Sequence, residues 1–180
     1  PDCSPQVLTG MLSTDPVLTA LVLSRCNAGR SANGEEVVHL PQASVMLGLS
    51  MMQGLVREVK PVAGTQRGLM ASVWAFANAA ATMARVLADH MPSRSPVRED
   101  PALLHTCALL HNLGTIAAAS CFPSQYTAAS RAHAQGDGAD FYRILREHIG
   151  LDQVGFGGLL ARGWYLPTAV SACIRWHRNP

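Results

Sequence analysis

The sequence predicts an all-α protein, a bundle of about ten helices, from its composition and from the spacing of its apolar residues. The chain contains 26 Ala and 21 Leu against 14 Val and 4 Ile, a balance that favours helix over strand. Apolar residues recur at helical spacing between Pro, Gly and Asp breakers, and no segment alternates apolar and polar residues between hairpin turns. The length of 180 residues suits a single domain, residues 1–180.

Helix-start and helix-stop signals divide the first 59 residues into short helices. Asp15 is a typical N-cap, and Pro16 fits the first helical turn, where its missing N–H costs nothing. Gly48 is a typical stop signal after the helix that Pro41 opens. The helices expected in this N-terminal group cover residues 6–12, 16–27, 41–48 and 49–59.

A second helical group is expected after a linker at residues 60–68, whose sequence KPVAGTQRG lacks apolar periodicity. This core covers residues 69–180 and begins with a long Ala-rich helix. Asp100 and Pro101 repeat the cap-and-proline start signal. The helices expected in the core cover residues 69–90, 101–111, 116–121, 124–134, 139–149, 152–162 and 166–177.

Composition and charge argue against several classes of partner. The formal charge is +2 without a basic run, which argues against nucleic-acid binding by bulk electrostatics. Residues 101–130 carry no charge and are long enough to span a bilayer, but His105, His111 and Gln125 would be costly in lipid, so we expect a buried helix pair and no membrane partner. Five cysteines without a CxxC pair favour a reducing cytoplasm.

The chemical signal of most interest is His111-Asn112 at the end of an apolar helix, followed by Leu113 and Gly114. A His-Asp pair at such a position can ligate a metal through imidazole and carboxylate, but Asn supplies only a neutral amide, a far weaker ligand. Two interpretations stay open: a degenerate metal motif, or a hydrogen-bonded core histidine followed by a helix-terminal residue. No two histidines have the i, i+4 spacing of a zinc-binding helix, and we expect no metal and no cofactor.

The aromatic and glycine residues are expected to serve packing. Trp74, Trp164 and Trp176 lie on or at the ends of expected helices and are predicted to anchor the core. Residues 155–158 (Gly-Phe-Gly-Gly) lack the Lys and the βαβ context of a phosphate loop, so their glycines are predicted to permit close helix packing.

Five segments, in order, resemble the HDOD domain, the HD-related output domain of bacterial signalling proteins. They are residues 15–18, which contain Asp15 and Pro16; residues 38–48, which end in Leu-Gly48; residues 108–114, which contain His111 and Gly114; residues 157–167, which contain Trp164 and Pro167; and residues 174–180. The resemblance covers nearly the whole chain. It implies an HD-like helical core over residues 69–180, in which Trp74 also belongs to the structural motif.

The related HD phosphohydrolases hold metals with His and Asp side chains, and the resemblance places their ligand positions at Phe76, His111-Asn112, Gln153 and His177-Arg178. Only His111 and His177 are good ligands among these. A divalent metal usually requires three or more protein ligands, and Arg178 would add a like charge. The resemblance therefore implies a degenerate HD site with no catalytic residue.

The expected function is a non-catalytic regulatory or scaffolding module of bacterial signal transduction that contacts other signalling proteins or domains. The alternative is a metal-dependent phosphohydrolase that acts on nucleotides or cyclic dinucleotides. A third hypothesis is that Arg178, His177 and Asn112 bind a small anionic ligand without hydrolysing it, since Arg suits bidentate phosphate contacts.

Overall fold

The computed structural model describes residues 4–29, 34–59, 66–91, 100–136 and 140–178, and these residues form helices and connecting turns without a strand. The all-α prediction is confirmed. The helices of the described residues are α1 Pro5–Leu12, α2 Pro16–Asn27, α3 Leu40–Glu58, α4 Gln66–His90, α5 Pro101–Leu110, α6 Leu113–Cys121, α7 Pro123–Gln135, α8 Phe141–Ile149, α9 Gln153–Gly163 and α10 Thr168–Trp176.

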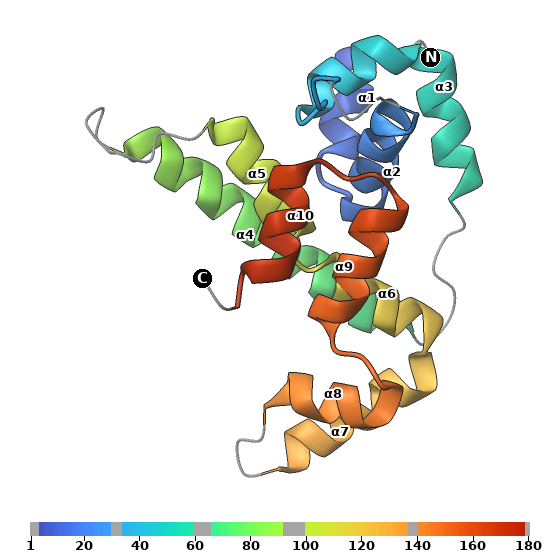
Figure 1. Ribbon diagram of the computed structural model, residues 1–180, viewed down its shortest axis with the longest axis vertical. Helices are drawn as coiled ribbons and strands as arrows, with labels where there is room; N and C mark the ends of the chain where they lie inside the picture. Colours follow the sequence, from blue (N-terminus) through green and yellow to red (C-terminus); the bar gives the residue numbers. More distant parts are fainter. Residues whose placement is uncertain (1–3, 30–33, 60–65, 92–99, 137–139, 179–180) are drawn as a thin grey trace.

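Figure 1 shows three regions along the long axis of the molecule. Helices α1, α2 and α3 form one end, the α7–α8 hairpin forms the other, and α5, α6, α9 and α10 lie between them. Helix α4 packs along α5, and the adjoining ends of these two helices project from the body as an arm.

Several helices begin where the sequence places a capping side chain. The Asp15 carboxylate accepts the backbone N–H groups of Val17 at 2.8 Å and Leu18 at 3.0 Å, which otherwise lack a partner. Asp100 caps α5 and Asp152 caps α9 in the same way. Each such cap contributes about 1 kcal/mol to stability.

Two helices begin three residues earlier than predicted, and the other boundaries agree to within two residues. Helix α4 begins at Gln66, so the last three residues of the predicted linker are helical, while residues 60–65 lie outside the described part of the chain. Gly68 lowers helix propensity by only about 1 kcal/mol, and a long helix tolerates it. Helix α6 begins at Leu113, three residues earlier than predicted.

The predicted break at Gly48 is present as a kink inside α3. Gly48 has a φ of +72°, a left-handed backbone conformation that residues with a Cβ rarely adopt. The helix changes direction at Gly48, so α3 consists of two segments, as expected from the Leu-Gly motif.

The N-terminal group and the core share one hydrophobic cluster, which includes Leu23 and Val37 from the former and Leu110 and Val170 from the latter. Polar contacts also cross the boundary. For example, Asn78 Nδ2 on α4 donates to the Thr14 carbonyl at 2.8 Å, and the Glu36 carboxylate accepts from Thr168.

The tryptophans divide into two kinds. Trp74 and Trp164 are partly buried against the main cluster, as predicted. Trp176 is 56% exposed, so the prediction of a core anchor is wrong for this residue. It lies in the last turn of α10, where its ring meets solvent and the Arg175 guanidinium, 5.6 Å from the ring centroid.

Among the described residues, one helical stretch, Pro101–Cys121, is long and apolar enough to cross a membrane; a second appears only if α1 and α2, bent by 117°, are joined. Within Pro101–Cys121, 56% of the tested window is buried inside the protein. The stretch is divided into α5 and α6 at His111 and Asn112, which agrees with the predicted buried helix pair.

Candidate functional site

Two histidines meet where α5 and α10 end. His111 is the C-cap of α5 and His177 is the C-cap of α10, and their ring centroids lie 5.2 Å apart in an edge-to-face arrangement. Phe76 of α4 packs against His111 with 5.7 Å between centroids. One cluster therefore contains Phe76, His111 and His177, which lie up to 101 positions apart in the chain.

Hydrogen bonds determine which ring nitrogen of each histidine carries the proton. His111 Nδ1 lies 2.6 Å from the Ala108 carbonyl, and His177 Nδ1 lies 3.0 Å from the Ile174 carbonyl. Because a carbonyl oxygen only accepts, each Nδ1–H is the donor, and in the neutral ring Nε2 keeps its lone pair. Each histidine thus offers one nitrogen as a ligand or acceptor.

The environment of His111 opposes its protonation. Burial lowers the pKa of His111 from its ordinary value of 6.5, the hydrogen bond to Ala108 partly offsets this, and the nearby His177 lowers it further. The neutral form of His111 is therefore favoured at pH 7.

Asn112 makes a local contact that the sequence analysis did not identify. Its Oδ1 accepts a hydrogen bond from Thr115 Oγ1 at 2.6 Å, so the amide oxygen is already engaged in the first turn of α6. Asn112 carries no charge, and its remaining capacity to bind a cation is small.

Arg178 is engaged by α8. Its guanidinium lies 3.4 Å from the ring centroid of Tyr142 and 3.5 Å from the Asp140 carboxylate. Both contacts favour the charged guanidinium in this position. Sequence reasoning could identify Asp140 only as a helix cap, and the pairing of Tyr142 with Arg178 depends on how the α7–α8 hairpin packs.

A cavity of about 250 Å³ opens beside this cluster. Phe76 and Asn112 line it together with Tyr142, which connects the cavity to Arg178. The other lining residues are Ser72, Val73, Thr115, Tyr126 and Phe141. We call Phe76, His111, Asn112, His177 and Arg178 the HD pocket.

Gln153 differs from the other predicted site residues. Its side chain is buried, its amide nitrogen and oxygen have no hydrogen-bond partner among the described residues, and it is not among the described residues that line the cavity. Its main chain instead meets α6, because a Cβ added at Gly114 would overlap the Gln153 carbonyl oxygen. The residue contributes to a helix crossing.

The close crossing of α6 and α9 confirms part of the glycine prediction. A Cβ at Gly157 would lie 2.5 Å from Ile174 Cγ2, so this position also requires glycine. Gly158 has open space at the corresponding point, and the expectation of close packing is wrong there because it faces away from the crossing.

The donors present do not fit a divalent metal. Across the described ranges, no three His, Cys, Asp or Glu side chains come together in a group that could hold one. The HD pocket offers two imidazole nitrogens, and the carboxylate of Asp140 is paired with Arg178. A divalent ion usually requires at least one more protein ligand, so no catalytic step through a metal is derived from these residues.

The helical architecture and the ordered motifs define a domain of the HD-related class. A family model described as the HDOD domain matches residues 1–180, and the chain belongs to that family.

One curated protein is similar to this chain over nearly its whole length. The chain is 24% identical over 192 residues to an uncharacterized protein of Treponema pallidum, and the match covers 99% of this chain but 34% of that protein. The chain thus spans about a third of the length of its curated relative.

Two solved structures show the same fold. The MmoQ response regulator of Methylococcus capsulatus has a TM-score of 0.81 at 20% identity, over 99% of this chain and 70% of that one. An HDOD domain protein with unknown function from Geobacter sulfurreducens has a TM-score of 0.51 at 18% identity, over 99% and 59%.

Proposed function

We propose that this protein is a non-catalytic regulatory or scaffolding module of bacterial signal transduction, and that it acts in the cytoplasm through contacts with other signalling proteins. The observation that carries the proposal is the content of the HD pocket. Where the related phosphohydrolases hold metals with His and Asp, this chain has His111-Asn112 and His177-Arg178.

The hydrogen bonds of the pocket support a structural role for these side chains. Each histidine closes the end of its own helix, Asn112 bonds to Thr115, and Arg178 joins α10 to α8. The histidines are the only HD-pocket residues with a nitrogen suited to a metal, and Arg178 would repel a cation near His177.

The family context supports a signalling role. The chain is an HDOD domain, and one protein of the same fold is a response regulator. A domain of this kind without a catalytic centre can act by binding a partner in one state and releasing it in another.

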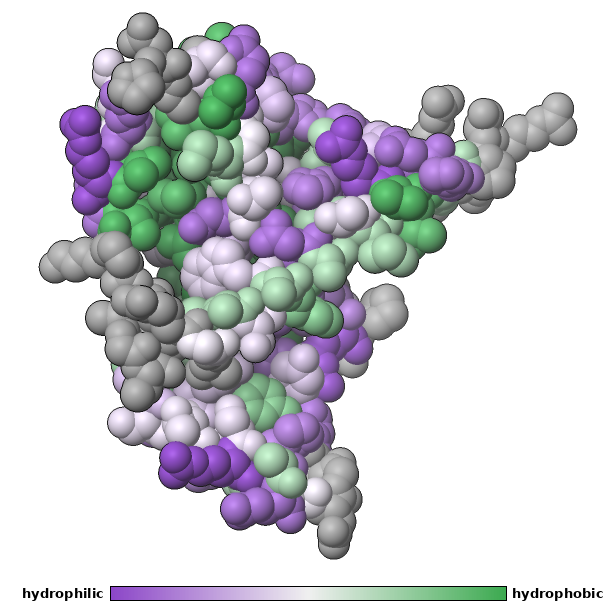
Figure 2. Space-filling view, turned by 180° about the vertical axis from the view of Figure 1, so that it is seen from behind, coloured by the Kyte–Doolittle hydropathy of each residue, from purple (hydrophilic) through white to green (hydrophobic). Residues whose placement is uncertain are grey.

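The arm formed by α4 offers a surface for such contacts. Met83 is 58% exposed and Leu87 is 61% exposed, and Val86 and Met91 extend the same apolar patch. Figure 2 shows hydrophobic side chains gathered on this projecting arm. Contiguous exposed apolar residues are typical of protein interaction sites, and methionine adapts readily to different partners.

Elemental analysis of protein purified without chelator tests the pocket. We expect near-zero stoichiometry of Zn, Mn, Fe and Mg, and no hydrolysis of cyclic dinucleotides or of bis(p-nitrophenyl) phosphate with added Mn²⁺. His111→Ala is the matched variant. A stoichiometric metal that His111→Ala loses, together with hydrolysis, would overturn the proposal in favour of the metal-dependent phosphohydrolase.

Site-specific crosslinking tests the contact surface. Leu87 is replaced by a photoreactive amino acid, and the protein is produced in the organism to which it belongs. We expect irradiation to give one crosslinked adduct of discrete mass. The same residue at the exposed Thr82 serves as control, and Met83→Glu should abolish the adduct at Leu87. Equal adducts from Leu87 and Thr82 would show that the arm is not a specific contact surface.

A further inference from the structure

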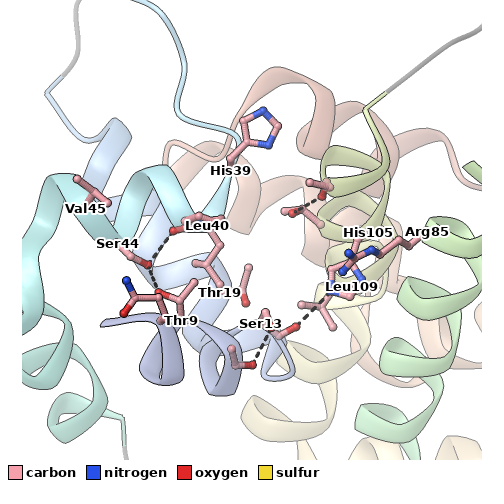
Figure 3. Close-up of a pocket in the computed structure, with 15 residues that line it drawn as sticks. Thr9, Ser13, Thr19, His39, Leu40, Ser44, Val45, Arg85, His105 and Leu109 are labelled. Atoms are coloured by element: carbon pink, nitrogen blue, oxygen red, sulfur yellow. Dashed lines mark hydrogen bonds between the residues drawn. The ribbon is translucent and has the colours of Figure 1, made fainter. Parts of the chain in front are cut away.

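A second, larger cavity lies between the N-terminal group and the core. It measures about 510 Å³, and it shares no described lining residue with the cavity of the HD pocket. Figure 3 shows Thr9 and Ser44 on one side of this cavity and Arg85 and His105 on the other. We call it the junction cavity. Its volume falls within the range of about 300–1,000 Å³ that is typical of small-molecule sites.

The lining of the junction cavity is positively charged. Arg85 of α4 lines it and has no hydrogen bond or ion pair among the described residues, and no Asp or Glu is among the described lining residues. His39 also lines it, with Nε2 3.4 Å from the Asp100 carboxylate. A guanidinium that the described residues leave unpaired beside a cavity is suited to bind a phosphate or carboxylate.

The beginning of α3 adds to this positive character. Leu40 and Pro41 line the cavity; Pro41 has no N–H, so Leu40 is the lining residue that offers one, and the N-cap His39 makes no capping hydrogen bond with its side chain. The first N–H groups of a helix carry partial positive charge, and an anion in the cavity would stabilise them.

His105 lines the junction cavity and also contacts the N-terminal group. Its Nε2 lies 3.4 Å from the Ser13 carbonyl, so Nε2 carries the proton and Nδ1 has a lone pair. Nδ1 is buried and has no hydrogen-bond partner among the described residues. An acceptor left unpaired in this way costs about 1–3 kcal/mol, and because protein atoms enclose Nδ1, a ligand in the cavity does not reach it in this conformation.

The hydroxyl groups of the lining are acceptors as well. Ser13 donates to the Gly10 carbonyl at 2.7 Å, and Thr19 donates to the Leu12 carbonyl at 2.8 Å. Because its proton is already engaged, the accessible Ser13 oxygen can only accept from a ligand, whereas Thr19 is buried and offers little surface to one. Leu40, Val45 and Leu109 supply apolar surface between the polar groups.

We propose that the junction cavity binds a phosphate monoester of a hydroxylated body with an apolar face, the chemistry that sugar phosphates and nucleoside monophosphates share. Arg85 binds the phosphate, while the Ser13 oxygen accepts from a hydroxyl group. The ligand would contact α1 and α3 on one side and α4 and α5 on the other. Binding would therefore stabilise one placement of the N-terminal group against the core.

Calorimetric titration with ribose 5-phosphate and AMP, without added metal, tests this proposal. Ribose and adenosine are the neutral controls, and inorganic phosphate tests the anion alone. We expect saturable binding of one or both monoesters, at least about tenfold weaker binding of the neutral controls, and a similar loss in Arg85→Gln. Tighter binding of AMP than of ribose 5-phosphate would identify a nucleoside, and the reverse would identify a sugar.

Matched variants locate the ligand. Arg162→Gln, an exposed arginine on α9, should leave the affinity unchanged, and amide chemical shifts of Thr9, Ser13, Ser44 and His105 should change on binding. No saturable binding of either monoester at millimolar concentration would overturn the proposal. Binding that Arg178→Gln abolishes and Arg85→Gln does not would also overturn it, because the ligand would then lie in the HD pocket. Neither result depends on whether the HD pocket holds metal, so the test is independent of the proposed function.

Discussion

At the scale of single residues, the HD pocket shows how local hydrogen bonds engage side chains that could otherwise act as ligands. His111 bonds to the carbonyl three residues earlier, and His177 does the same on α10. Asn112 bonds within its own turn to Thr115. Such i−3 and i+3 contacts stabilise helix ends, where backbone carbonyls and hydroxyls otherwise meet water.

The lowered pKa of His111 predicts a specific pH dependence of stability. Between that pKa and about pH 6.5 the unfolded chain binds a proton that the folded protein excludes, so the free energy of unfolding falls as the pH falls through this range. Well above about pH 6.5 His111 is neutral in the folded and the unfolded chain, so it no longer makes the free energy of unfolding depend on pH. Urea unfolding at about pH 7.5 and about pH 5.5 should show a smaller pH dependence in His111→Gln than in the unmodified protein. The exposed His148 provides the control, and an equal flattening in His148→Gln would contradict the prediction.

Asn112→Asp restores a carboxylate beside His111 with little change of shape. Aspartate can still accept the Thr115 hydroxyl, so we expect the fold to persist. Affinity for Zn²⁺ should rise by at least about tenfold, because a carboxylate is a far stronger ligand than a neutral amide. The measurement is a competition titration with a zinc indicator. Gln125→Glu adds the same charge at an exposed site, and an equal rise there would show that only net charge matters.

At the scale of helices, the pair Gly114 and Gly157 determines how closely α6 and α9 approach. Backbone atoms of Gln153 and Gly157 occupy the space that a side chain at Gly114 would need. Backbone cannot move as a flexible side chain can, so this crossing tolerates no added methyl group. The crossing also positions the start of α9 against the helix that follows His111-Asn112.

Gly114→Ala should lower the free energy of unfolding by about 3 kcal/mol or more, because the added methyl group overlaps backbone. Gly158→Ala on α9 has open space and should change stability by no more than about 1 kcal/mol, in the favourable direction, through helix propensity. Urea denaturation of both variants measures the difference. Equal stabilities would mean that α6 and α9 do not cross at Gly114.

At the scale of the whole molecule, the junction between the N-terminal group and the core is part hydrophobic and part polar. A continuous cluster of buried side chains joins the two groups, while Asn78 to Thr14 and His105 to Ser13 are polar contacts at the rim. The junction cavity lies among these contacts. A ligand there and a partner on the α4 arm would act on the same helix, since Arg85 lies between Met83 and Leu87.

The arrangement of the whole molecule also predicts the order of methionine oxidation. Met46 and Met83 are more than half exposed, whereas Met52 and Met70 are buried. Dilute hydrogen peroxide should convert the exposed pair to sulfoxides well before the buried pair, as measured by peptide mass spectrometry. A protein partner on the α4 arm should slow oxidation of Met83 and leave Met46 unchanged. Early oxidation of Met52 would contradict the placement of α3.

Sequence reasoning predicted most of the helices and part of the site. Caps such as Asp15 and the stop at Gly48 are local signals, so they could be identified without tertiary information. The start of α4 at Gln66 could not be identified in this way. Gly68 lowers the helix propensity of this segment, but packing of α4 along α5 stabilises the helix despite it. The prediction that Trp176 anchors the core was wrong because the hydrophobicity of a residue does not show which face of α10 meets solvent.

The sequence by itself determined the all-α class, the HDOD family and the presence of Asn112, a neutral amide, after His111. These properties depend on residue types and on spacings within single helices, which the chain carries locally. Only the tertiary structure decided that His177 faces His111, that Arg178 pairs with Asp140 and Tyr142, and that a cavity lies beside Arg85. Those relations join segments far apart in the chain, and their geometry is set by how closely the helices pack.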